Sequence, residues 1–161
     1  MDIKQTQQHA MKPTKHTVLI TGGATGIGYA IARKFHAAGN RVILAGRSEK
    51  SLIQACNQMS GAEFSVSDIS KPEDRDSLLQ QFPDVNILVN NAGIQINTSI
   101  LDSTPAQMEY ELNINFLAAA LLCRAYLPRM VQQTDAAIIN ISSGLAIVPK
   151  ENASMYCASK A

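Results

Sequence analysis

Three glycines between a short apolar run and a helical pattern constrain this chain more than any other feature. The apolar run covers residues 17–20, and Gly22, Gly26 and Gly28 follow it directly. Glycine lets the backbone approach a ligand closely, and free N–H groups at the start of a helix attract an anion. The pattern therefore favours a dinucleotide-binding turn over an ordinary tight turn. It is not a P-loop, because Tyr29 stands where that motif has lysine.

Strand-like and helix-like segments alternate along the rest of the chain. We expect strands at 17–20, 41–45, 62–68, 87–89 and 136–141, and helices at 27–38, 48–58, 70–82 and 104–128, with another helix starting near Met155. Capping boxes at Ser70 and Thr104 support two of the helix starts. This alternation predicts an α/β fold: a Rossmann-type, doubly wound parallel sheet in a three-layer α/β/α arrangement, with five strands in the order 3-2-1-4-5.

Composition limits the remaining choices. The 161 residues suit one domain, with residues 1–16 as a disordered tail before the Rossmann domain at 17–161. Lys and Arg number 14 against 13 Asp and Glu, which excludes a basic footprint for nucleic acid or an anionic membrane. The longest apolar run, 116–123, is far shorter than the ~20 residues of a membrane span. Cys56, Cys123 and Cys157 are separated and odd in number, which predicts reduced thiols in a cytoplasmic protein and no metal site.

The end of the second expected strand bears on the choice of cofactor. Enzymes that use NAD often place an acidic residue there, about 20 residues after the glycines, to bind the ribose 2′-hydroxyl. This chain has Arg47 instead, and a guanidinium suits the 2′-phosphate of NADP. We therefore expect NADP(H) to be preferred and NAD(H) to be possible, although Thr25 adds no second basic group. The alternative is a solvent-facing arginine at a helix start.

Two further motifs carry chemistry. Residues 90–93, Asn-Asn-Ala-Gly, follow the fourth expected strand, where the carboxyl ends of parallel strands form a ligand crevice. Tyr156 and Lys160 are four residues apart on the last expected helix and so share one face. An ammonium beside a phenol stabilises the phenolate, which lets the phenol exchange a proton with a substrate oxygen. Without the other motifs such a pair would more often be an ordinary surface pair.

Together these motifs resemble the short-chain dehydrogenase/reductase family over residues 17–161. The resemblance rests on Thr21 with the three glycines, residues 90–93, Ser142 with Ser143, and Tyr156 with Lys160, in that order and spacing. Residues 141–146, 148–149 and 156–161 resemble the DltE-type branch. The resemblance implies an oxidoreductase that transfers a hydride between NAD(P) and a carbonyl or alcohol substrate.

The resemblance also implies roles for individual residues. Tyr156 would be the general acid/base, and Lys160 would tune it and bind the nicotinamide ribose. Ser143 would polarise the substrate carbonyl, with Ser142 pointing the other way. Asn115 would belong to the proton relay, with Asn113 as the alternative. The implied cofactor-binding residues are Thr21, Gly22, Thr25, Gly26, Ile27, Gly28, Arg47, Asp68, Ile69, Asn90, Ala92, Gly93, Tyr156 and Lys160.

Two rival classes and the assembly remain to be considered. A serine hydrolase is disfavoured, because Ser143 lacks a G-x-S-x-G frame and the histidines lie in the tail and the first helix. A dinucleotide-binding fragment without turnover is the stronger rival.

Residues 114–123 are apolar nearly all round apart from Asn115, which fits burial against the sheet or also against a second subunit. Family members commonly dimerise through this helix, so the resemblance implies a homo-oligomer.

Family members continue past the position of Ala161 with more helix, two strands and a substrate-covering segment. We therefore expect the domain to be incomplete at its C-terminal end. The 161-residue chain alone should aggregate, bind cofactor weakly or not at all, and show no measurable reductase activity. The strand at 136–141 would be an open apolar edge, and the last helix would be too short to hold itself. Size-exclusion chromatography and an NADPH oxidation assay on residues 1–161 check this. A monodisperse protein whose turnover is lost in Tyr156→Phe would contradict it.

Overall fold

The computed structural model describes residues 14–161 and contains one five-stranded parallel sheet. Its strands are β1 (Thr17–Thr21), β2 (Arg41–Gly46), β3 (Glu63–Val66), β4 (Ile87–Asn90) and β5 (Ala137–Asn140). They lie in the order β3-β2-β1-β4-β5, which confirms the predicted Rossmann-type topology. The reversal of strand order falls between β1 and β4, and ligands of such sheets bind at that point, beyond the carboxyl ends of the strands.

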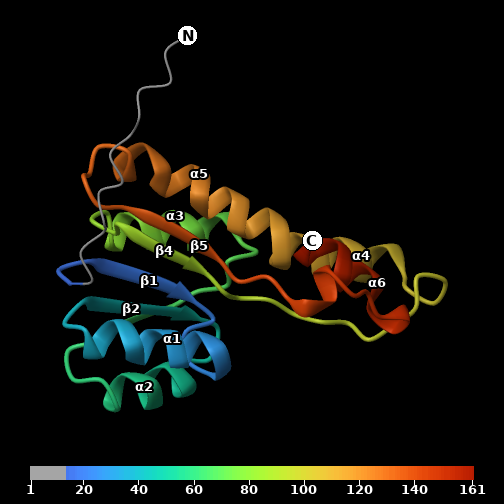
Figure 1. Ribbon diagram of the computed structural model, residues 1–161, viewed down its shortest axis with the longest axis horizontal. Coiled ribbons are helices and arrows are strands. Elements are labelled where there is room, and N and C mark those ends of the chain that lie inside the picture. The colour runs from blue at the N-terminus through green and yellow to red at the C-terminus, as the bar shows by residue number, and fades with distance from the viewer. Residues whose placement is uncertain (1–13) are drawn as a thin grey trace, which may run out of the picture.

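Helices cover both faces of the sheet (Figure 1). On one face lie α1 (Gly26–Ala37) and α2 (Glu49–Asn57), and on the other lie α3 (Pro72–Gln81) and α5 (Ala118–Met130). Two more helices, α4 (Pro105–Leu112) and α6 (Ser154–Lys160), lie beyond the carboxyl ends of the strands (Figure 1). Within residues 14–161, no helix combines the length and the apolar character needed to cross a bilayer.

The sheet separates two apolar cores. Side chains of a strand alternate between the two faces, so neighbouring residues of β1 enter different cores. Leu19 packs with Leu122 and Tyr126 on the α3–α5 side. Ile20 packs with Leu52 on the α1–α2 side. All five of these side chains are fully buried. Because both faces of the sheet are covered, its strands are continuous apolar runs in the sequence.

The helix expected at 104–128 is interrupted in the structure. It comprises α4, a π-helical turn at Asn113–Leu117, and α5, which runs on to Met130. The Thr104 capping box is confirmed: the Thr104 hydroxyl accepts from the Gln107 N–H, and the Gln107 side chain accepts from the Thr104 N–H at 2.9 Å. The π turn, which no sequence pattern indicated, sets which residues of this long helix face the site.

The Ser70 capping box is wrong. The residue that caps α3 is Lys71, whose side chain makes no capping hydrogen bond. Ser70 instead turns back toward Asp68, to whose Oδ1 its hydroxyl donates at 2.7 Å. The serine is therefore engaged by the loop that precedes the helix, one residue too early to cap it.

The start of the folded part also differs from the prediction. Residues 1–13 of the predicted tail lie outside the described residues. His16, however, is only 4% exposed, and its backbone N–H donates to the Asn40 side chain at 3.0 Å. The Asn86 amide lies 3.0 Å from His16 Nδ1. His16 thus belongs to the folded domain, and the predicted boundary after residue 16 lies at least one residue too late.

Candidate functional site

The glycine turn after β1 is tied to the segment after β4 by a small hydrogen-bond network. The Thr21 hydroxyl oxygen accepts from the backbone N–H groups of Asn91 and Ala92, each at 3.0 Å. In return the Asn91 side-chain amide donates to the carbonyl oxygens of Thr21 at 3.0 Å and Gly22 at 3.2 Å. Sequence reasoning had left Asn91 out of the site, although its place in the 90–93 motif was a usable signal.

Gly28 allows this network to pack against helix α1. A Cβ at this position would overlap the Gly22 carbonyl oxygen and lie 2.5 Å from Asn91 Nδ2. By contrast, Gly26 has a φ of +55° and open space where a side chain would stand. Helix α1 begins there with no side-chain cap and no acidic residue in its first turn. Its first N–H groups and the positive end of its dipole therefore suit an anion such as a pyrophosphate.

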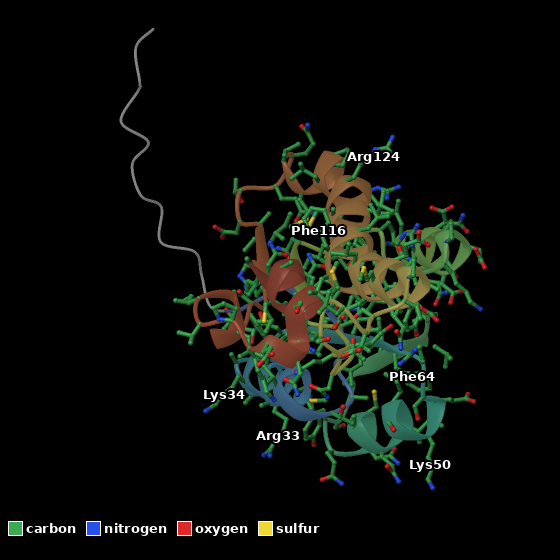
Figure 2. All side chains as sticks on the ribbon, turned by 90° about the vertical axis from the view of Figure 1, so that its right-hand side faces the viewer. Arg33, Lys34, Lys50, Phe64, Phe116 and Arg124 are labelled. Atoms are coloured by element: carbon green, nitrogen blue, oxygen red, sulfur yellow. The ribbon has the colours of Figure 1, made fainter. Side chains whose placement is uncertain are left out.

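A cavity of about 310 Å³ extends from the glycine turn along the ends of β2 and β3. Seven of the predicted cofactor-binding residues line it: Gly22, Thr25, Arg47, Asp68, Ile69, Ala92 and Gly93. Ile27 does not, and its side chain is 64% exposed. Ser67, Ile94 and Ile114 are lining residues that the sequence analysis missed. Figure 2 views the molecule from this end, onto the carboxyl ends of the strands.

Charges on the cavity wall are arranged around Arg47 and Asp68. Burial raises the pKa of Asp68, but hydrogen bonds from Ser70 and the positive charges of Arg47 and Lys71 outweigh it and hold that pKa below its ordinary value. Asp68 is therefore an ionised acceptor at neutral pH. Within residues 14–161 Arg47 forms no ion pair, and its one hydrogen bond runs from Nη1 to the Tyr110 hydroxyl at 3.2 Å. The cavity thus carries a guanidinium without a bound carboxylate.

A second cavity, of about 290 Å³, shares Ile69 and Ala92 with the first. Asn115 lines it from the π turn and is 7% exposed. Its Oδ1 accepts from the Ile94 N–H at 2.8 Å, and its Nδ2 donates to the Ile94 carbonyl at 2.8 Å and to the Ser159 hydroxyl at 2.9 Å. Asn90 also lies here, in contact with Asn140 of β5 at 2.9 Å, rather than on the wall of the first cavity.

The π turn separates Asn115 from the alternative, Asn113. Asn113 lies on the outer side of the turn, beside the exposed side chains of Phe116 and Leu117. Only Asn115 is held against the segment after β4 and against α6. Of the two asparagines, Asn115 is therefore the one in the site.

Lys160 reaches the same place from α6. Its ammonium donates to the Ile141 carbonyl at 3.0 Å, and the Ser142 hydroxyl donates to the Lys160 carbonyl at 2.6 Å. A Cβ on Gly93 would lie 3.3 Å from Lys160 Nζ and 3.2 Å from Asn115 Oδ1, so the bare backbone leaves room for both groups. Burial lowers the pKa of the Lys160 ammonium, which makes it a more ready proton donor.

Ser143 and Tyr156 are less closely joined. The Ser143 hydroxyl accepts from the Leu145 N–H at 3.2 Å and so caps a 3₁₀ turn, Gly144–Ala146, that packs on α6. Tyr156 precedes Lys160 by about one turn of α6, and its carbonyl accepts from the Ser159 hydroxyl at 2.8 Å. Within residues 14–161 no hydrogen bond links the hydroxyls of Ser143 and Tyr156.

The sheet order, with these two adjoining cavities beyond the carboxyl ends of its strands, defines a Rossmann-type domain, and comparison with known proteins agrees. The family described as short chain dehydrogenase matches residues 16–161, so the chain belongs to this family. It is 38% identical to the oxidoreductase DltE of Bacillus subtilis over 94% of this chain. It is 35% identical to the 3-oxoacyl-[acyl-carrier-protein] reductase FabG of Rickettsia prowazekii over 92% of this chain. The chain spans 62% of the length of each of these two relatives.

Solved structures show the same likeness. One short chain dehydrogenase/reductase family protein superposes with a TM-score of 0.89 at 34% identity, covering 93% of this chain and 64% of that protein. A short-chain dehydrogenase from Streptomyces avermitilis superposes with a TM-score of 0.84 at 29% identity, covering 91% of this chain and 56% of that protein. Together with the family match, these structures show that the chain has the fold of the short-chain dehydrogenase family.

The close approach at Gly28 leads to a testable prediction. Gly28→Ala should lower the free energy of unfolding by about 1–3 kcal/mol and abolish nucleotide binding, because α1 must move away from Gly22 and Asn91. Urea unfolding and titration with 5′-AMP measure the two effects. Gly144→Ala is the matched control, since a Cβ there meets open space. Tight 5′-AMP binding by Gly28→Ala would contradict this account of the turn.

Proposed function

We propose that this protein is an NADP(H)-dependent reductase of the short-chain family that acts on a small carbonyl or alcohol substrate. The observation that carries the proposal is the convergence of Asn115 and Lys160 on Gly93, beside the cavity that begins at the glycine turn. The bound cofactor would supply the hydride that reduces the carbonyl carbon. The protein would supply the proton and would orient the substrate relative to the cofactor.

The residues around the first cavity fit the adenosine and pyrophosphate part of NADP(H). The uncapped start of α1, with Thr25, Gly26, Ile27 and Gly28, would bind the pyrophosphate through backbone N–H groups. Asp68 and Ile69 would bracket the adenine, and Asp68 remains an acceptor because its pKa is held low. Arg47 would bind the 2′-phosphate. Residues 90–93 would lie beneath the ribose and nicotinamide, with Asn90 supporting the turn from below.

Proton transfer would run through α6. In our mechanism the Tyr156 hydroxyl would donate its proton to the substrate oxygen, which would become the hydroxyl of the alcohol product. Lys160 would stabilise the resulting phenolate and bind the nicotinamide ribose. The hydrogen bonds of Asn115 to Ile94 and Ser159 hold its amide beside Gly93, where it would help to position the proton relay. Ser143 would donate its hydroxyl proton to the carbonyl oxygen, because its bond with the Leu145 N–H uses only an oxygen lone pair.

A second candidate function is nucleotide binding without turnover. It is favoured by one observation: the Ser143 hydroxyl is engaged as a cap and is not bonded to Tyr156. Binding of NADPH with normal affinity, combined with no oxidation across a panel of aldehydes and ketones, would support this alternative. Turnover that depends on Tyr156 would exclude it.

The cofactor preference is testable at Arg47. Arg47→Ala should weaken NADPH binding by about 1.5–3 kcal/mol, because a charge-assisted contact with the 2′-phosphate is lost, and should leave NADH binding nearly unchanged. Fluorescence titration of both cofactors on wild type and variant measures this. A wild type that prefers NADH, or a preference that survives the substitution, would show that the assignment is wrong.

The catalytic proposal is tested at Tyr156. Tyr156→Phe removes only the hydroxyl, so we expect carbonyl reduction to be lost while NADPH binding stays within about twofold of wild type. The assay uses the longest open reading frame that carries this sequence. Comparable turnover in the variant would exclude Tyr156 as the proton donor.

We also propose a homo-oligomer formed through α4, the π turn and α5. Phe116, Leu117, Leu127 and Val131 are 62%, 47%, 46% and 63% exposed, which is unusual for large apolar side chains on one stretch of helix. Phe116 stands at the surface in Figure 2. Phe116→Asp should therefore shift the protein from dimer to monomer in light scattering, and an unchanged mass would argue against this interface.

A further inference from the structure

Arg47 lines the first cavity and is hydrogen-bonded to a residue from a distant part of the chain. Arg47 follows β2, whereas Tyr110 lies on α4, 63 residues later in the chain. The two side chains meet at 3.2 Å, between Arg47 Nη1 and the Tyr110 hydroxyl. Ile114, about one helical turn after Tyr110, lines the cavity itself. Tyr110 itself lines the outer groove with Asn113, and its hydroxyl reaches the edge of the first cavity where it meets Arg47.

The direction of this hydrogen bond is fixed by chemistry. A guanidinium has five N–H donors and no acceptor, so the tyrosine oxygen must accept. The O–H of Tyr110 is then left to donate elsewhere, and within residues 14–161 the Tyr110 hydroxyl makes no other hydrogen bond. Arg47 likewise keeps four of its five donors. The pair presents one positive charge and a neutral O–H donor to the same space, a combination that suits a phosphate dianion better than a ribose hydroxyl.

Two other hydroxyls near Arg47 are each bonded to a neighbouring serine. The Ser48 oxygen accepts from the Ser51 N–H at 3.3 Å and is bonded to the Ser51 hydroxyl at 2.9 Å. The Ser67 hydroxyl is bonded to that of Ser65 at 2.9 Å. The next residue that bears charge, Glu49, lies in the first turn of α2 and would repel an anion. Tyr110 is thus a neutral donor that is already in contact with Arg47 and can assist it.

We propose that Tyr110 is a specificity-determining residue that binds the 2′-phosphate of NADP(H) together with Arg47. This inference rests on the cofactor preference proposed above and adds a second ligand to it. Tyr110 acts in two ways: its oxygen restrains the long arginine side chain, and its O–H donates to the phosphate. The restraint reduces the side-chain entropy that Arg47 loses when the cofactor binds. Thr25 in the glycine turn carries no charge. The pair of Arg47 and Tyr110 would therefore take the place of a second basic residue.

The test uses adenosine fragments, which need only the first cavity. Calorimetric titrations with 2′,5′-ADP and with 5′-AMP compare wild type, Tyr110→Phe, Arg47→Ala and the double variant. Tyr110→Phe should weaken 2′,5′-ADP binding about tenfold and change 5′-AMP binding less than about twofold. Because the two residues act on one group, the double variant should lose less than the product of the two single losses.

A matched control separates this pair from a general effect of charge. Lys50 is exposed on the outer side of α2, three residues after Arg47 (Figure 2). Lys50→Ala should change the affinity for 2′,5′-ADP less than about twofold, since it removes a cation of the same region without touching the pair. A loss as large as that of Arg47→Ala would indicate long-range charge in place of a direct contact of the pair with the phosphate, and would overturn the inference.

The outcomes distinguish this inference from the proposed function. If Arg47→Ala abolishes the preference for 2′,5′-ADP but Tyr110→Phe leaves it intact, the inference is overturned and the proposed preference stands. If wild type shows no preference for 2′,5′-ADP over 5′-AMP, the proposed preference is overturned and the inference with it. If Tyr110→Phe weakens both fragments equally, Tyr110 has only a structural role and the inference is again overturned.

Discussion

The site depends on the contact between the turn after β1 and the segment after β4. Thr21 and Asn91 exchange hydrogen bonds across the point where the strand order reverses, and Gly28 lets the first turn of α1 lie directly on them. The start of α1, which Gly28 lets pack beside this contact, is uncapped by any side chain. Its first backbone N–H groups are therefore available to an anion close to the point where the strand order reverses.

The second half of the site depends on the π turn. One additional residue in the helical turn rotates Asn115 toward Ile94 and Ser159 and leaves Asn113 outside. The asparagine then connects three parts of the chain that are far apart in sequence. Lys160 completes the arrangement through its bond to the Ile141 carbonyl, and the absence of a side chain on Gly93 gives both groups room. The π turn and the bare backbone at Gly93, rather than the regular helices and strands, therefore determine where Asn115 and Lys160 lie.

The topology could be predicted because strand and helix patterns alternate and because parallel crossovers are right-handed. The positions of most helices and strands followed from apolar spacing and from caps such as Thr104. The Ser70 cap failed, since a pattern of residue types cannot show that the serine is engaged by Asp68. His16 was assigned to the tail because its burial depends on Asn40 and Asn86, both distant in the chain.

The site could be predicted where it consists of local motifs. The roles of the individual side chains stay predictions, and the structure adds which of them meet. Arg47 and Tyr110 show the limit most clearly, because neither residue has a motif that refers to the other and only the folded chain brings them to 3.2 Å. The same is true of Asn91, whose amide bonds to the glycine turn rather than to its own strand.

Hydrogen exchange with and without NADPH tests most directly the claim that the turn after β1 and the segment after β4 form one cofactor site. The account predicts that NADPH slows exchange of the backbone amides at residues 25–28 and 91–94 together, while α3, on the far side of the sheet, is unchanged. Protection confined to other segments, or protection of residues 91–94 without residues 25–28, would contradict it.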